Sequence, residues 1–275
     1  MTSQIAFIGA GNMASAIFGG MIDAGYPADA ITATSPDDNH LAPLRSRYGI
    51  HTTTDNNAAV ADADVVVLAV KPQLMREVCA AMRDAVQARQ PLIVSVAAGL
   101  TAETLDDWLG GGLAVIRCMP NTPALVGAGA SGLYANARVS DDQRSLATTL
   151  LEAVGLVEWV DDEVLLEAVT AVSGSGPAYF FLIFEALEDA GKRLGLPARS
   201  ARRLALQTAF GAARMAQQSE FDPAQLKRNV MSPGGTTERA VQSFEDGGLR
   251  QLFENATEAC AQRAREMSEE LGNQR

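Results

Sequence analysis

Two kinds of hydrophobic pattern alternate along the first 160 residues of the chain. Short apolar runs are separated by stretches in which apolar residues recur every three or four positions, the period of a helix. The run Asp64–Val70 is almost entirely apolar, as in a strand buried on both faces. This alternation predicts a doubly wound α/β domain with a parallel sheet over residues 1–160. The expected strands are Ile5–Ile8, Ile31–Thr34, Asp64–Val70, Pro91–Ala97 and Leu113–Ile116, and the expected helices include Asn12–Ala24, Gln73–Gln87 and Ala102–Leu109.

The pattern changes after residue 160, and we expect no strand between Asp162 and Gly272. Long helical stretches punctuated by prolines predict an all-α domain over residues 161–275. Phe180–Phe184 is a continuous apolar run, so its helix is apolar around the whole circumference and needs burial on all sides. A domain of this size meets that need most easily by pairing with a second copy, which predicts an oligomer interface. The expected helices are Tyr179–Leu194, Arg199–Gln218 and Leu249–Leu271.

Composition and charge narrow the class of protein. Of the 275 residues, 47% are hydrophobic and 20% are charged, which is typical of a soluble globular chain. The net charge is −11 and neither half is basic, which argues against a nucleic-acid partner or a polybasic membrane patch. Glycines interrupt the uncharged segments Met1–Ile22 and Ala168–Phe184, so we expect neither a targeting sequence nor a membrane span.

The cysteines point to a reducing compartment. Cys79, Cys118 and Cys260 are too few and too scattered for a disulfide framework or a zinc site. We therefore expect a cytoplasmic protein without a structural metal.

A glycine-rich turn follows the first expected strand and opens a helix. Gly9 permits the tight turn, Gly11 lets the backbone approach a pyrophosphate, and Ala14 stands where a third glycine often occurs. This context favours a dinucleotide site over a turn without a ligand. The residues expected to contact the cofactor here are Gly9, Ala10, Gly11, Asn12 and Met13.

The end of the second strand is expected to recognise the adenosine ribose of the dinucleotide. A carboxylate usually stands there when the 2′-hydroxyl is free, but this chain has Thr34 and Ser35, and Asp37 comes slightly late. Because the Ser35 hydroxyl can donate to a 2′-phosphate, we favour NADPH over NADH, with use of both as an alternative. Ser35, Pro36 and Asp37 are otherwise only a turn that starts a helix.

Two further segments follow expected strands. Lys71 is the only lysine in the first 160 residues, and Pro72 holds it out of helical geometry. Strand ends are where ligands of open α/β sheets bind, so we expect an electrostatic role for Lys71, with a solvated lysine as the alternative. The small residues of Ser95–Gly99 would let a nicotinamide ring lie close to the backbone.

The segment Arg117–Pro123 follows the next strand, and its two prolines predict a rigid loop. Cys118 has no histidine partner in sequence, because His40 and His51 are distant and are the only two histidines. We interpret Cys118 as a packing residue and both histidines as ordinary surface residues.

Two glycine-rich segments lead into helices of the second domain, Val172–Tyr179 and Asn229–Thr237. Backbone amides at a helix start form an anion site. Gly234–Thr237 would hold a small carboxylate, with the Thr237 hydroxyl left to bond a neighbouring heteroatom. A capped helix start without a ligand is the alternative.

Taken together, the motifs resemble those of the pyrroline-5-carboxylate reductases, over essentially the whole chain. The motifs that carry the resemblance are Gly9–Ala14, Ala69–Pro72, Met119–Pro123, Ser173–Tyr179 and Ser232–Thr237, and the last is the most specific. The resemblance implies hydride transfer from NAD(P)H to the C=N bond of 1-pyrroline-5-carboxylate, which gives L-proline in the last step of proline biosynthesis. It also implies a Rossmann domain and a helical domain that intertwines with a partner into a homodimer, which often assembles further into a decamer.

The resemblance assigns site residues by position. It implies that Thr237 lies in the substrate pocket, and we choose Thr237 as the catalytic residue whose hydroxyl bonds the ring nitrogen. An imine is already electrophilic, so the implied chemistry is positioning, and it requires neither a metal nor a histidine acid. The implied substrate residues are Glu163, Asn229, Gly234, Gly235, Thr236, Thr237 and Glu220, and further implied cofactor residues are Ser35, Pro36, Asp37, Asn56, Ala69, Val70, Lys71, Pro72 and Ala97.

Two alternatives are weighed against this reading. A β-hydroxyacid dehydrogenase also joins a glycine fingerprint to a helical domain, but it needs a lysine there, and neither Lys192 nor Lys227 sits in a matching motif. A non-catalytic NADP-binding sensor is disfavoured by the intact segment Ser232–Thr237.

Overall fold

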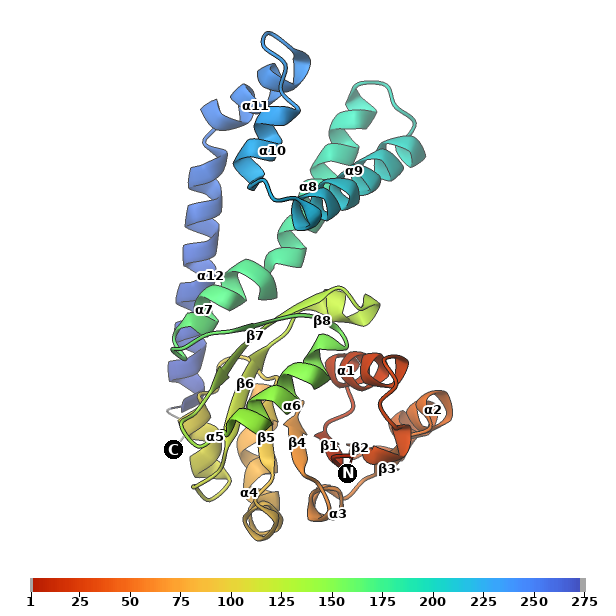
Figure 1. Cartoon of the computed structure of the whole chain (residues 1–275), viewed down its shortest axis with the longest axis vertical. Coiled ribbons are helices and arrows are strands. Elements are labelled where there is room, and N and C mark those ends of the chain that lie inside the picture. Colours follow the sequence, from red (N-terminus) through yellow and green to blue (C-terminus); the bar gives the residue numbers. More distant parts are fainter. Residues whose placement is uncertain (1, 273–275) are drawn as a thin grey trace. The chain divides into compact units, whose positions relative to one another are not determined.

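The computed structural model describes residues 2–272. It divides into two compact units: residues 2–175 with 259–272 form the first, and residues 176–258 form the second. Figure 1 shows strands only in the first unit and helices alone in the second.

The first unit is built on an eight-stranded sheet in the order β3-β2-β1-β4-β5-β6-β7-β8. The six strands from β3 to β6 are parallel, β7 runs antiparallel to β6, and β8 runs parallel to β7. The order of the six parallel strands is that of a dinucleotide-binding Rossmann fold. The strands are β1 (Ile5–Ile8), β2 (Ile31–Thr34), β3 (His51–Thr53), β4 (Val65–Leu68), β5 (Leu92–Ser95), β6 (Val115–Met119), β7 (Gly129–Ala135) and β8 (Gly155–Trp159).

Helices cover both faces of this sheet because the central strands are buried on both sides. One face packs against α1, α2 and α6 through Phe18, Leu41 and Leu150. The other packs against α3, α4 and α5 through residues such as Met75 and Leu105. The helices are α1 (Asn12–Asp23), α2 (Asp38–Tyr48), α3 (Asn56–Ala61), α4 (Pro72–Arg89), α5 (Ala102–Trp108) and α6 (Asp141–Glu152), with short 3-10 turns η1 (Ala28–Ala30) and η2 (Thr122–Val126).

The doubly wound fold and the five predicted strands are confirmed, whereas β3, β7 and β8 were not predicted. β7 reads Gly-Ala-Ser-Gly-Leu-Tyr-Ala and lacks the β-branched residues that mark strands. Gly132 lies where a Cβ would come within 2.5 Å of the Val169 side chain. The small residues therefore let α7 (Leu165–Val169) pack closely on the strand. Because they are small and only weakly hydrophobic, a hydrophobicity pattern does not predict this strand.

The first unit continues past residue 160. After α7, a π-helical turn, η3 (Thr170–Gly174), completes the segment, and Leu166 and Ala171 are buried. The C-terminal part of α12 (Leu249–Gly272) also belongs here, with Leu271 buried against the loop that carries Gly99. The domain boundary that we placed between residues 160 and 161 stays a prediction.

The second unit is entirely helical, and no strand occurs between residues 162 and 272, as predicted. α8 and α9 pack closely, because a Cβ at Gly191 would lie only 3.1 Å from that of Ala201, and Arg202 forms a two-bond ion pair with Glu188 at 2.7 and 3.1 Å. The helices are α8 (Gly176–Arg193), α9 (Ala198–Gln218), α10 (Pro223–Asn229), α11 (Thr236–Asp246) and the first part of α12.

Large apolar side chains are exposed on this unit. Phe181 is 63% exposed and Leu182 66%, although the sequence predicts that their helix needs burial on all sides. An exposed patch of this kind marks an interaction surface. Further exposed apolar residues are Phe180, Leu204, Phe210, Met215, Phe244 and Leu252.

We expected no membrane span, but residues 165–193 form a helical stretch long and apolar enough to cross a membrane by length and composition alone. This is weak support for a span, because core helices of soluble proteins meet the same criterion. A helix that is buried against a second copy of the chain is also long and apolar, so the composition of residues 165–193 agrees with the expected oligomer interface.

Candidate functional site

The sheet reverses its strand order between β1 and β4, and ligands of such sheets bind at that point, beyond the carboxyl ends of the strands. Gly9 follows β1 with φ = +99°, and a Cβ on it would lie 2.7 Å from the Ala69 carbonyl oxygen. Only glycine fits between these two segments. The turn therefore lies with Gly9 beside Ala69 and Val70, all three of them predicted cofactor contacts.

The start of α1 offers free backbone amides. Gly11 is its N-cap residue, no side chain among residues 2–272 caps it, and a Cβ on Gly11 would meet open space. An uncapped helix start next to open space suits the pyrophosphate of a dinucleotide. Asn12 and Met13, also predicted contacts, form the first helical residues.

His40 takes part in holding this turn. Its Nε2 lies 2.8 Å from the Ala10 carbonyl oxygen and donates to it, and the Thr34 hydroxyl accepts from the Gly9 amide at 3.2 Å. Reading His40 as an ordinary surface residue was therefore incomplete: its ring is exposed but ties α2 to the glycine-rich turn.

The segment after β2 is a helix start, as the alternative reading proposed. Asp37 accepts from both the backbone and side-chain nitrogens of Asn39 at 2.9 Å, which caps α2. Its carboxylate is therefore engaged at the helix start, while Ser35 is half-buried and Pro36 is exposed. Asn56 is half-buried at the start of α3, whose N-cap is Asp55.

Lys71 stands exposed at the N-cap position of α4, with Pro72 as the first helical residue. Within residues 2–272 it forms no ion pair. An exposed lysine without an ion pair agrees both with the predicted electrostatic role at the ligand-binding edge of the sheet and with the alternative of a solvated lysine, so the role of Lys71 stays a prediction.

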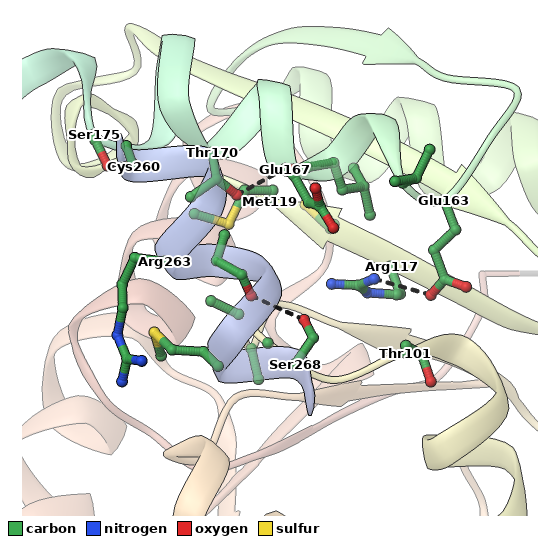
Figure 2. Close-up of a pocket in the computed structure, with 18 residues that line it drawn as sticks. Thr101, Arg117, Met119, Glu163, Glu167, Thr170, Ser175, Cys260, Arg263 and Ser268 are labelled. Carbon is green, nitrogen blue, oxygen red and sulfur yellow. Dashed lines mark hydrogen bonds and ion pairs between the residues drawn. The ribbon is translucent and has the colours of Figure 1, made fainter. Parts of the chain in front are cut away.

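A cavity of about 540 Å³ lies in the first unit, beyond the ends of β5 and β6 (Figure 2). Ala97, Ala98 and Gly99 line it, as does Glu163, so it joins one predicted cofactor contact to one predicted substrate contact. Figure 2 shows that α12, which carries Arg263 and Ser268, lies on the opposite side of this cavity from Glu163.

Glu163 is held in this cavity by two donors. Its Oε1 accepts from the Ala102 amide at 2.7 Å and from Arg117 Nη1 at 2.9 Å. The Arg117 side chain is 13% exposed and that of Glu163 25%. Arg117 is a site residue that sequence reasoning missed, although it opens a loop that the sequence analysis singled out.

Two of the sequence motifs meet through Asn121. Its Nδ2 donates to the Ser173 carbonyl at 3.0 Å, and its Oδ1 accepts from the Ala130 amide at 2.9 Å. Ser173 lies in the π-helical turn, where a Cβ at Gly174 would come within 2.6 Å of the Met119 side chain. Such turns leave carbonyls without a helical partner and often occur at functional sites, so the buried Asn121 supports the wall of the cavity.

Cys118 also contributes to the cavity lining, but its thiol is buried, which raises its pKa to about 12. A thiol with so high a pKa stays protonated and is a poor nucleophile. This agrees with the interpretation of Cys118 as a packing residue.

The remaining predicted substrate residues lie in the second unit. Gly234 has φ = +72°, and its amide donates to Glu238 Oε2 at 2.7 Å, while the Gly235 amide donates to the Ser232 carbonyl. A carboxylate thus already binds at the start of α11. Because the first amides of a helix have no partner within it, those of Thr236 and Thr237 remain as donors.

The side chains around this segment are accessible. Thr237 is half-buried and Thr236 is exposed. Asn229, the last residue of α10, accepts from Gln225 at 2.7 Å, and both Asn229 and Glu220 are exposed.

Comparison with known proteins defines the class of the chain and then its family. A family model described as NADP oxidoreductase, coenzyme F420-dependent, matches residues 4–99, so the first domain is that of an NADP-dependent oxidoreductase. A second model, described as pyrroline-5-carboxylate reductase dimerisation, matches residues 163–267. This match supports oligomerisation through the helical domain.

Relatives of known function extend over the whole chain. A pyrroline-5-carboxylate reductase of Pseudomonas aeruginosa is 54% identical over 98% of this chain and 99% of that protein. The reductase structure from Coxiella burnetii has a TM-score of 0.94 at 47% identity, covering 98% and 99% of the two chains. That from Plasmodium falciparum, with NADP bound, has a TM-score of 0.85 at 28% identity, covering 97% and 98%. The chain belongs to the pyrroline-5-carboxylate reductase family, which confirms the resemblance.

Proposed function

We propose that this chain reduces the C=N bond of 1-pyrroline-5-carboxylate with NADPH and forms L-proline, the last step of proline biosynthesis. The observation that carries the proposal is the match to a pyrroline-5-carboxylate reductase at 54% identity over nearly the full length of both chains. The test is NADPH oxidation that depends on added pyrroline-5-carboxylate, repeated with NADH.

The edge of the sheet between β1 and β4 fits the cofactor. Gly9 permits the close approach of two backbone segments, and the space beside Gly11 is open. When bound, NADPH supplies the hydride. The chain's own contribution is to hold the pyrophosphate at the α1 amides, to place a cation at Lys71, and to offer the small residues from Ala97 to Gly99 to a flat ring.

The ribose pocket favours NADPH over NADH, with NADH as an alternative cofactor. Asp37 caps α2 through Oδ1, and it comes later after β2 than the carboxylate that usually meets a free 2′-hydroxyl. The half-buried Ser35 hydroxyl is the group we assign to the 2′-phosphate.

Cofactor preference is expected to respond to Ser35. Ser35→Glu should raise KM for NADPH by about 10-fold or more, because it replaces a donor to the phosphate with a like charge. KM for NADH should change little, since that cofactor has no phosphate there. Steady-state kinetics with both cofactors measure this, and equal effects on the two would mean that the ribose binds elsewhere.

For the substrate, we propose that the amides of Thr236 and Thr237 receive the carboxylate and that the Thr237 hydroxyl bonds the ring nitrogen. Gly234 and Gly235 shape this segment, and the Glu238 carboxylate already accepts a hydrogen bond from the Gly234 amide just before the helix. We also assign Glu163, Asn229 and Glu220 to substrate binding. Catalysis is then the alignment of an electrophilic carbon with the hydride donor.

We further propose a cytoplasmic homodimer formed through the helical domain, with assembly into a decamer as an extension. The large exposed apolar side chains of α8 support the dimer. The three free cysteines agree with a reducing compartment.

The purified protein is therefore expected to sediment as a dimer or a larger assembly. Leu182→Glu should shift it towards smaller species, because it puts a charge into the exposed apolar patch. Leu156→Glu is the matched control: Leu156 is 65% exposed, but it lies on β8 in the other unit. A well-folded wild-type monomer at micromolar concentration would contradict the proposal.

The β-hydroxyacid dehydrogenase alternative needs an available lysine in the helical domain, and both lysines there are paired. Lys192 pairs with Asp189 at 2.7 Å, and Lys227 pairs with Glu245 at 3.2 Å. Both lysines therefore have structural partners. The sensor alternative would return only if NADPH bound without turnover.

A further inference from the structure

Arg117 is a shielded cation at the functional edge of the sheet. It lies on β6, in register with Ser95 of β5 and with Tyr134 of β7, and its side chain is 13% exposed. A charge so shielded from water is costly unless it is paired. Its partner is Glu163, from the segment between β8 and α7.

Glu163 is fixed through one oxygen only. Oε1 accepts from both Arg117 on β6 and the Ala102 amide at the start of α5, so two separate segments donate to this one atom. Within residues 2–272, Oε2 accepts no hydrogen bond, and it is the oxygen left for a ligand.

The other charged residues that line the cavity are paired elsewhere. Glu167 pairs with Arg265 at 2.9 Å, and Arg263 pairs with Glu266 and Glu270 at 3.1 and 2.8 Å. Arg117 is therefore the cation that both orients Glu163 and balances its charge.

We propose that Arg117 is a positioning residue for substrate binding: it holds the Glu163 carboxylate in place so that the free oxygen faces the cationic, protonated ring of the substrate and stabilises its charge. This rests on the proposed function, which assigns Glu163 to the substrate site. Arg117 does not touch the substrate; it acts through Glu163.

A double-mutant cycle tests this directly. Arg117→Met and Glu163→Gln should each raise KM for pyrroline-5-carboxylate by about 10-fold, because the first loosens and the second neutralises the carboxylate that faces the cationic ring. The double variant should be no worse than Glu163→Gln alone, because Arg117 has then lost the group it positions. The dissociation constant for NADPH should stay within about twofold in all three, since the β1–β4 edge is untouched.

Two further variants separate positioning from folding. Arg117→Lys keeps the charge and should recover part of the loss. Arg138→Met is the matched control, because Arg138 pairs with Asp106 at 3.5 Å away from the cavity, and it should leave KM unchanged. If Arg117→Met fails to fold, the KM of the double variant can still be compared with that of Glu163→Gln, because the double variant leaves no unpaired charge. This comparison alone shows whether Arg117 acts through Glu163.

Several results would overturn the proposal. If the double variant has a KM about tenfold above that of Glu163→Gln, Arg117 acts on the substrate independently. An unchanged KM in Arg117→Met would mean that the ion pair is only structural. Failure of the proposed function is a separate outcome, because the wild-type enzyme would then show no oxidation of NADPH dependent on pyrroline-5-carboxylate.

Discussion

Gly9→Ala is expected to lower kcat/KM for NADPH by about 100-fold. At φ = +99° any other residue is strained, which costs about 1–3 kcal/mol. The new methyl would also lie 2.7 Å from the Ala69 carbonyl oxygen and 2.9 Å from a Val70 methyl group. The glycine-rich turn and the segment before Lys71 would have to move apart, and both are assigned to the cofactor. NADPH titration by fluorescence and steady-state kinetics measure the effect.

Gly25→Ala is the matched control for this variant. Gly25 has φ = +96°, nearly that of Gly9, but a Cβ there meets no atom within 4 Å. It follows the C-terminal end of α1, away from the helix start that we assign to the pyrophosphate. Gly25→Ala should lower the melting temperature and leave KM for NADPH unchanged. If both variants affect NADPH equally, backbone strain alone explains the result and the turn is not a cofactor contact.

Thr237→Ala is expected to lower kcat/KM for pyrroline-5-carboxylate by roughly 10- to 100-fold, because a hydrogen bond to a charged group is worth about 1.5–3 kcal/mol. The Thr237 side chain is half-buried and, within residues 2–272, makes no hydrogen bond that the variant would break. The loss should therefore be one of turnover and not of folding. The dissociation constant for NADPH should hardly change, because Gly9, Gly11 and Ser35 remain.

Thr237→Ser should recover much of the activity, since it restores the hydroxyl. Thr257→Ala is the matched control: Thr257 bonds only carbonyl groups of its own helix, α12, and its loss should leave kcat/KM unchanged. Near-full activity in Thr237→Ala would mean that Thr237 only starts the helix and has no role in catalysis. The partner of the ring nitrogen would then be Glu163 or a bound water.

The parts of the fold that could be predicted from sequence are those in which local pattern and burial agree. β4 is four apolar residues, all of them buried, and Gly9 is a glycine because two backbone segments meet there. The unpredicted strands lack this agreement. β8 reads Gly-Leu-Val-Glu-Trp and is not fully buried at any position. Within the described part of the chain it pairs only with β7, itself rich in small residues.

The candidate site was predictable where a motif forms a complete local structure. The start of α1 and the segment before α11 are of this kind, because the glycines and the helix that follows them are adjacent in sequence. The pair Arg117–Glu163 is not, since 46 residues separate the partners. The bond from Asn121 to Ser173 likewise spans 52 residues. Only the packing of β6, β7 and α7 brings such groups together.

The most direct test of the account is the stoichiometry of the reaction with the wild-type protein. NADPH oxidation and L-proline formation should be followed together after addition of pyrroline-5-carboxylate. We predict one L-proline formed for each NADPH oxidised, and a lower kcat/KM when NADH replaces NADPH. Tight binding of NADPH with no substrate-dependent oxidation, or oxidation without L-proline, would contradict it.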